Sequence, residues 1–414
     1  MWNDKMIKIS SVMDVLIKKI GLNILAIFIV AVLISCSKPV KDVYWVEQAL
    51  VNAEKQSFLM AKSIENMPDR LPRSTDSNGK LVTCTSDWWC SGFFPGTLWY
   101  LYENNKNEDI KKYATNFTNR INKEQYNTST HDLGFMLYCS YGNALRLSGE
   151  DSCKSVLING ANSLSTRFNP TVGCIQSWGA GEKWRYPVII DNMMNLEMLM
   201  WAYKQTGNVK YRDISISHAN KTIKYHFRAN NSSYHVLSYN PETGEPEFKG
   251  TDQGYSDASA WARGQAWGLY GFTMMFRETG DSTYLNHAHR IARFILNHPN
   301  LPENKIPYWD FDAPKIPNEY YDSSSAAIIA SALLELSTFS NKKNGAVYFS
   351  VAEKQLRTLA SSEFTAEPGT NGNFILKHGV GNIPQNSEID RPLSYGDYYY
   401  VEALLRYKKL IRKI

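Results

Sequence analysis

The sequence predicts an all-α protein whose helices pair into hairpins and close into an (α/α)6 barrel. Signals that end one helix and start the next recur along the chain, while strand-like alternation is limited to short pieces such as SYHVLSY. The connections are of two kinds, short polar turns and long aromatic loops, as expected if the turns lie at one end of a ring of hairpins and the loops at the other. About six hairpins fit this length as one domain. An open solenoid of stacked hairpins is the structural alternative.

The N-terminal segment is predicted to be a signal peptide. Lysines precede the apolar run GLNILAIFIVAVLIS, the order typical of a secretory signal. The run ends in LISC, and a small residue before Cys36 resembles a bacterial lipobox, in which that cysteine is lipidated. An uncleaved anchor helix is the alternative, although the run is short for a membrane span. We therefore expect a signal peptide over 1–35, a single domain over 36–414, and a lipoprotein of a Gram-negative-type bacterium in the periplasm or at the cell surface.

Charge and cysteine content exclude several classes of partner. The formal net charge is only +5 and no basic run stands out, so nucleic acid is not expected. No later segment is long and apolar enough to span a membrane, so attachment is expected only through the lipid at Cys36. No Cys/His spacing suggests zinc, and we predict no structural metal. An oxidising compartment would permit a bridge between Cys84 and Cys90, a question that the sequence leaves open.

Five short turns define the predicted hairpins. In chain order they are LYENNKNEDIKKY, LRLSGEDSC, YKQTGNVKY, FRETGDSTY and LSTFSNKKNGAVY. Glycine after the last helical turn supplies the left-handed conformation of a helix end, and the polar residue after it can cap the next helix.

The long connections hold most of the candidate site. They include LVTCTSDWWCSGFFPG, NPTVGCIQSWGAGEKWRYP and NPETGEPEFKGTDQGYSDASAWARG, and they carry or adjoin the tryptophans Trp88, Trp89, Trp178, Trp184, Trp261 and Trp267. Each ring by itself could pack in the wall of the barrel, but exposed tryptophan is costly unless it binds something. Rings beside carboxylates, histidines and amides suit sugars, which have apolar faces and hydroxyl edges.

Four acids stand at loop-to-helix junctions: Asp132, Asp191, Asp257 and Asp322. Asp191, for example, follows the apolar run 188–190 and precedes an amphipathic helix pattern. Aspartate is a favoured N-cap, so all four could be caps. Two that face each other across a funnel could instead share an acid/base task.

Six stretches resemble the unsaturated glucuronyl hydrolases, glycoside hydrolase family 88. They are WCSGFFPGTLW (89–99), HDLGF (131–135), DNMMNLEML (191–199), YHVLSY (234–239), DQGYSDASAWARGQAWGLYG (252–271) and PLSYGDYYYVEALLR (392–406). The resemblance implies an (α/α)6 barrel, no metal or organic cofactor, and two catalytic acids at Asp132 and Asp191. The substrate-binding residues it implies are Trp89, His131, Trp178, His235, Gln253, Arg263 and Trp267.

The resemblance also implies a reaction. The substrate would be an oligosaccharide left by a polysaccharide lyase, of glycosaminoglycan type, with a C4=C5 double bond in its terminal uronate. Asp191 would protonate C4 and then activate the water that adds at C5, while Asp132 would stay ionised and stabilise the positive charge. A helix N-terminus lowers the pKa of a carboxyl group, whereas burial and a second carboxylate raise it. We expect the raising effects to prevail, with Asp191 acting both as a cap and as the acid.

Three other functions remain open at this point. Unsaturated rhamnogalacturonyl hydrolases share the fold and chemistry but act on pectin fragments. A non-catalytic helical lipoprotein could bind glycans with the same aromatic rings. A barrel-shaped sugar epimerase would need a pair of histidines as acid and base. The C-terminal residues Lys377, His378 and Arg391 could contact a sulfate on the substrate, or could simply be solvated.

Overall fold

The computed structural model describes residues 43–181 and 183–412, and from Tyr44 onward these belong to one compact unit. The predicted signal peptide and Cys36 lie outside the described residues. Among the helices that are described, none has the length and apolar character needed to cross a membrane.

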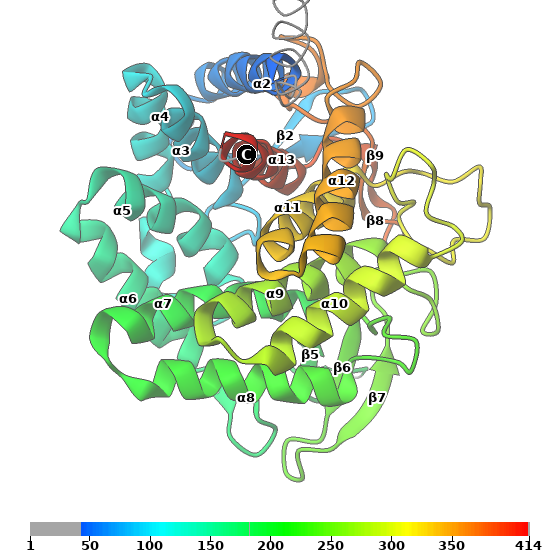
Figure 1. The fold of residues 1–414 in the computed structure, drawn as a ribbon. Helices are drawn as coiled ribbons and strands as arrows, with labels where there is room; N and C mark the ends of the chain where they lie inside the picture. Colours follow the sequence, from blue (N-terminus) through cyan, green and yellow to red (C-terminus); the bar gives the residue numbers. More distant parts are fainter. Residues whose placement is uncertain (1–42, 182, 413–414) are drawn as a thin grey trace, which may run out of the picture. The chain divides into compact units, whose positions relative to one another are not determined.

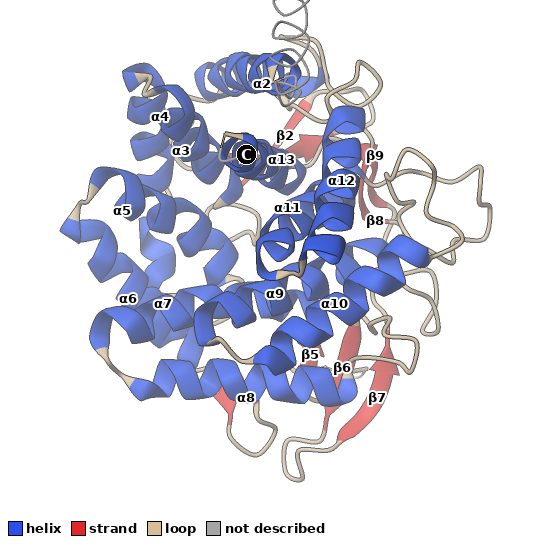
Figure 2. Ribbon diagram, viewed as in Figure 1, coloured by secondary structure: helices blue, strands red, loops and turns tan. Residues whose placement is uncertain are grey.

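The described residues are mostly helical, as predicted (Figures 1 and 2). The α-helices are α2 (Tyr44–Ser63), α3 (Phe93–Asn105), α4 (Glu108–Asn119), α5 (Asn143–Ser148), α6 (Asp151–Ser165), α7 (Leu196–Thr206), α8 (Val209–Tyr225), α9 (Ala262–Thr279), α10 (Ser282–Asn297), α11 (Ser323–Phe339), α12 (Lys342–Leu359) and α13 (Ser394–Ile411). A π-helix, η2 (Gly134–Gly142), continues into α5, and a 3-10 helix, η3 (Ile190–Asn195), continues into α7. The short 3-10 helices η1 (Asn122–Tyr126) and η4 (Asn371–Asn373) lie in connections.

The five predicted turns are confirmed. They join α3 to α4, α5 to α6, α7 to α8, α9 to α10 and α11 to α12. Gly149, Gly207 and Gly280 end their helices with φ of 73°, 72° and 72°, the left-handed region in which glycine has no steric penalty. The side chains of Asn208 and Asp281 then accept the N–H groups of Lys210 and Thr283, and so cap the following helices.

The helices form two layers that differ in burial. In α9, α11 and α13 nearly every residue along most of the helix is buried, which places these helices inside. In α10 the buried residues recur every three or four positions, as in a helix with one face on the core. The inner helices pack side by side: α9 contacts η3 and α11, α13 contacts α11 and α3, and α3 contacts η2.

The long connections contain small antiparallel sheets, of which strands β6, β7, β8 and β9 lie to the right of centre in Figure 2. The strands are β1 (Leu71–Thr75), β2 (Leu81–Cys84), β3 (Phe168–Asn169), β4 (Cys174–Ile175), β5 (Pro187–Ile189), β6 (Val236–Tyr239), β7 (Pro246–Gly250), β8 (Gly379–Asn382) and β9 (Ser387–Arg391). In the three-stranded sheet β5-β6-β7, Ile189 pairs with Val236. This pairing brings the residue before η3 next to His235, and so begins to assemble the site.

Candidate active site

The predicted site residues come together at the N-terminal ends of the inner helices. Asp132 lies two residues before η2, Asp191 is the second residue of η3, and Arg263 and Trp267 lie in the first turns of α9. The Arg263 and Asp132 charges both act on the Asp191 carboxyl group. Trp178 is placed less directly, since it packs on the small apolar cluster of Trp184, Ile189 and Val236.

The prediction that Asp191 caps a helix is wrong. The N-cap position of η3 is Ile189, and no side chain caps this helix. The chain enters η3 directly from strand β5, with the N–H of Ile190 donating to the carbonyl of His235 at 3.0 Å. Asp132 and Asp257 are not caps either: η2 has no side-chain cap, and Asp257 accepts the N–H of Thr251 at 2.8 Å. Of the four acids, Asp322 caps its helix, α11.

Asp191 is a weaker acid than an exposed aspartate, because its side chain is buried. Only 10% of its side chain is exposed. Burial raises its pKa to about 7; the Arg263 guanidinium opposes the rise and the Asp132 carboxylate adds to it. This agrees with the expected raised pKa, although the opposing charge is an arginine and not only a helix end.

His235 serves as a hydrogen-bond donor. Its Nδ1 accepts the backbone N–H groups of Asp252 and Gln253 at 3.0 and 3.2 Å, so the neutral ring carries its proton on Nε2. That atom lies 3.8 Å from Oδ2 of Asp191. Burial lowers the pKa of His235 to about 3 and also lowers the pKa of His131. With a pKa of about 3, His235 is not suited to exchange protons near neutral pH, so the pair of histidines that an epimerase needs has less support.

Buried polar atoms without partners gather around Asp191. Among the described residues these include Asp191 Oδ2, His235 Nε2, Arg263 Nε and Tyr395 OH, while Trp267 interacts with the Asp191 carboxyl group and Asn192 with His131. Buried polar groups are normally paired, so a cluster of unpaired ones indicates that a polar ligand completes the set. Asn192 and Tyr395 were not among the predicted site residues. Both lie in stretches that carry the family resemblance, and that resemblance is the signal by which the sequence could have identified them.

Aromatic rings pack beneath these polar atoms. The Phe135 ring lies 5.1 Å from that of Trp267 and 5.7 Å from that of Trp89, and the Trp89 ring lies 4.8 Å from that of Tyr395. Trp267 is fully buried, and its side chain interacts with the Asp191 carboxyl group. Trp88 stands apart, 40% exposed and stacked under Arg73 at 4.3 Å.

Two of the three candidate sulfate contacts, Lys377 and His378, are already engaged within the protein. Lys377 donates to the carbonyl of Ser362 at 2.7 Å, and His378 pairs with Asp390 at 2.7 Å.

The cysteines Cys84, Cys90, Cys139, Cys153 and Cys174 are free and buried. Within the part of the chain that the structure describes, no group of three or more His, Cys, Asp or Glu is arranged to hold a metal ion.

Comparison with known proteins gives a consistent family. The model of Glycosyl Hydrolase Family 88 matches residues 60–409. The unsaturated glucuronyl hydrolase of Formosa agariphila is 43% identical over 348 residues, which are 83% of this chain and 86% of that protein. The crystal structure of an unsaturated glucuronyl hydrolase specific for heparin is 48% identical and superposes with a TM-score of 0.87, covering 89% of this chain and 98% of that one.

A structure of a Streptococcus agalactiae unsaturated glucuronyl hydrolase mutant is also similar. It is 27% identical, with a TM-score of 0.75, and covers 90% of this chain and 97% of that one. That mutant is complexed with dGlcA-GalNAc6S, an unsaturated disaccharide.

Proposed function

The chain belongs to glycosyl hydrolase family 88, and we propose that it removes the terminal 4,5-unsaturated uronic acid from oligosaccharides that lyases release from glycosaminoglycans. The observation that carries this proposal is Asp191, a buried carboxylic acid with a pKa of about 7 and an unpaired Oδ2. Such a group can donate a proton at neutral pH, and unpaired donors surround it. The Formosa agariphila protein and the heparin-specific enzyme described above support the same activity.

The first step is protonation of the double bond. The C4=C5 bond is an enol ether, because the ring oxygen is attached to C5. The proton moves from Asp191 to C4, and the π electrons form the new C–H bond, which leaves positive charge shared between C5 and the ring oxygen. Asp132, on the loop before η2, supplies a nearby carboxylate that stabilises this charge.

The second step adds water at C5. The Asp191 carboxylate now accepts a proton from a water molecule while the water oxygen bonds to C5, which restores the acid. The resulting hemiketal opens and releases the remaining saccharide. In this proposal the uronate is bound by His235 Nε2 and Arg263 Nε, which have no hydrogen-bond partner among the described residues.

The two other glycan functions have weaker support. A rhamnogalacturonyl hydrolase would use the same acid, but the relatives described above are glucuronyl hydrolases, one of them specific for heparin. A non-catalytic binder has no need of a buried acid whose pKa is raised to about 7.

Isotope labelling tests this reaction directly. Turnover in D₂O should place one deuterium at C4 of the opened product, and oxygen from labelled water should appear at C5. The matched control is a saturated glucuronide with the same aglycone, which offers no acceptor at C4 and should not be cleaved. Label at the anomeric carbon, or comparable turnover of the saturated compound, would contradict the mechanism.

Two finer features are part of the proposal. We propose that the five hairpins, together with a sixth pair formed by α13 and α2, close into an (α/α)6 barrel, which is supported by the packing of α13 against α3, α11 and α2. Closure predicts that deleting 394–414 unfolds the whole unit, as measured by circular dichroism against the full chain.

We also propose a lipoprotein anchored at Cys36, with its domain in the periplasm or at the cell surface. Cys36→Ala should then change membrane fractionation, and an unchanged distribution would contradict the anchor.

A further inference from the structure

Asp322 makes more hydrogen bonds than a helix cap requires. The residue is fully buried, and its Oδ1 accepts the N–H and hydroxyl groups of Ser324 at 3.1 and 2.6 Å, which is the cap of α11. The same oxygen accepts the N–H of Val380, on strand β8, at 3.3 Å. Its Oδ2 accepts the hydroxyl of Ser325 and, at 3.3 Å, Nη1 of Arg263. One carboxylate therefore joins α11, β8 and the arginine of the candidate site.

Arg263 is held on every side except one. Its Nη1 also donates to the carbonyl of Val380, and its Nη2 donates to Gly381 at 2.7 Å and to Oε1 of Gln253 at 2.8 Å. Both terminal nitrogens are thus used within the protein, while Nε has no partner. The side chain is 2% exposed, so the guanidinium cannot rely on water to solvate its charge.

Several charged or titratable groups face this guanidinium. They are Asp322 on α11, Asp191 on η3, Glu388 on β9 and Tyr395 on α13. Glu388 is already paired with Arg73. Asp322 is paired with Arg263 alone, and among the acids Asp191 has the next largest effect on the Arg263 charge.

We propose that Asp322 is a positioning residue for the reaction, which clamps Arg263 onto strand β8 and keeps this buried cation paired with Asp322 instead of with Asp191. The inference rests on the proposed function, because it assigns Asp191 as the acid. With the clamp in place, Arg263 presents its Nε–H edge to the ligand. Without it, the unpaired guanidinium would favour the ionised form of Asp191, and the acid would lose its proton at lower pH.

Asp322→Asn tests the clamp because asparagine is also a good helix cap but carries no charge. The basic limb of the kcat/KM profile on an unsaturated glucuronyl disaccharide should move to lower pH. A movement of one pH unit would lower kcat/KM about tenfold on the alkaline side of the limb and leave it nearly unchanged well below the limb. Asp281→Asn is the matched control, since Asp281 caps α10 with a similar bond at 2.8 Å and is exposed. This control should not move the limb.

A second measurement does not depend on turnover. The chain with native Asp191 and its Asp191→Asn variant are compared by thermal unfolding from pH 4 to 9, once with Asp322 and once with Asp322→Asn. The chain that keeps the buried acid loses stability as pH rises toward the folded pKa of Asp191, whereas the amide does not titrate. The pH at which the difference between the two chains stops growing therefore reports that pKa. It should fall in the Asp322→Asn background.

An unchanged limb and an unchanged unfolding difference would overturn the proposal. If the native chain showed no hydrolysis, the proposed function would fail, yet the unfolding comparison would still decide the role of Asp322. If neither Asp322→Asn nor Asp322→Ser folds while Asp281→Asn does, Asp322 serves the fold alone and the proposal is wrong.

Discussion

Both ends of the inner helices carry buried charged residues, but the two ends differ in whether the polar atoms of these residues have hydrogen-bond partners. At the N-terminal ends lie Asp191 and its neighbours, several of them with unpaired polar atoms. At the C-terminal ends lies a cavity of about 670 Å³, lined among others by Tyr100, Glu197, Arg277 and Glu402. Of the described residues that line it, none carries a buried polar side-chain atom without a partner. Several polar groups of this cavity are paired with one another, such as Tyr100 with Glu402 and Arg277 with Glu197, whereas several around Asp191 have no partner.

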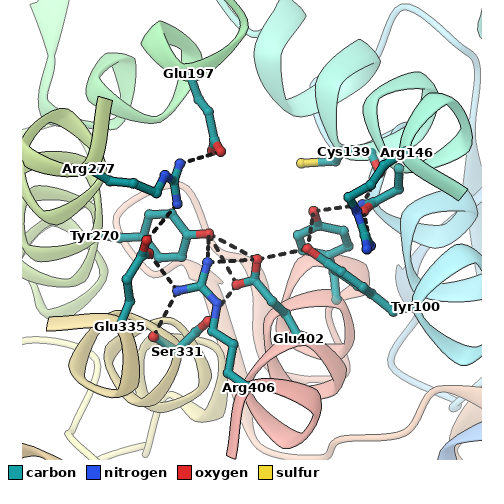
Figure 3. Close-up of polar contacts among 12 residues, drawn as sticks. Tyr100, Cys139, Arg146, Glu197, Tyr270, Arg277, Ser331, Glu335, Glu402 and Arg406 are labelled. Carbon is teal, nitrogen blue, oxygen red and sulfur yellow. Dashed lines mark hydrogen bonds and ion pairs between the residues drawn. The ribbon is translucent and has the colours of Figure 1, made fainter. Parts of the chain in front are cut away.

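The pairing at the C-terminal ends is continuous, as Figure 3 shows. Glu402 on α13 accepts the hydroxyl groups of Tyr100 at 2.8 Å and Tyr270 at 2.9 Å, and also pairs with Arg406 at 3.2 Å. Arg406 and Arg277 both pair with Glu335, at 2.8 and 2.7 Å, and Arg277 also contacts Glu197. This network links α3, α7, α9, α11 and α13, so its charges hold helices together.

A raised pKa alone does not identify an active site. Burial raises the pKa of Glu197 to about 7, as it does for Asp191. It also raises the pKa of Asp397 to about 7, although Asp397 accepts the backbone N–H groups of Ile375 and Leu376 and has an evident structural role. What distinguishes Asp191 is an oxygen without a partner among donors that also lack partners.

The largest expected effect is on kcat, and it separates Asp191 from Glu197, whose pKa is also raised to about 7. Asp191→Asn should keep the fold and lower kcat by about 10²–10⁴-fold or more, because the amide cannot deliver a proton. Glu197→Gln is the matched control from the other end of the helices, and it should keep activity within a few-fold. Retention of more than a tenth of native kcat by Asp191→Asn would show that another group is the acid. An equal loss in Glu197→Gln would break the distinction between the two ends.

The next effect falls on stability. Glu402→Ala should lower the free energy of unfolding by about 3–5 kcal/mol, because it removes a buried carboxylate that accepts the hydroxyl groups of Tyr100 and Tyr270 and is one of the two carboxylates paired with Arg406. Thermal or denaturant unfolding measures the change, and kcat/KM of the folded variant should stay near native. The control is Glu303→Ala, whose pair with Lys354 is exposed, at 3.5 Å, and should contribute less than about 1 kcal/mol. Similar losses in both variants would mean that the network is not a structural element.

The smallest effect is the pH dependence of the native enzyme. Because the acid form of Asp191 is required and its pKa is raised to about 7, kcat/KM should decline as pH rises through this value. At pH 8 roughly a tenth of the molecules would carry the proton, so kcat/KM should be about tenfold below its maximum. Rates measured at subsaturating substrate from pH 5 to 9 check this. A profile that stays level up to pH 9 would exclude Asp191 as the proton donor.

Sequence reasoning predicted the helical class and the turns because these depend on neighbouring residues. The glycines that end α5, α7 and α9 and the polar residues that follow them are local signals with local consequences. The same reasoning failed for Asp191 as a cap. Whether an acid caps a helix depends on how the chain enters the helix. Here strand β5, which is paired with β6, leads directly into η3, and its last residue, Ile189, occupies the N-cap position.

The hairpins, the family resemblance and the residue types gathered in the long loops can all be read from the order of residues. The raised pKa of Asp191, the protonated nitrogen of His235 and the contacts by which Asp322 joins Arg263 to β8 cannot. These properties come from burial and from partners that are distant along the chain. The Arg263 guanidinium, for example, donates both to Gln253, which precedes it in the sequence, and to Gly381, which follows it by more than a hundred residues. A pKa and a hydrogen-bond partner are set by the surroundings in space, which the order of residues does not state.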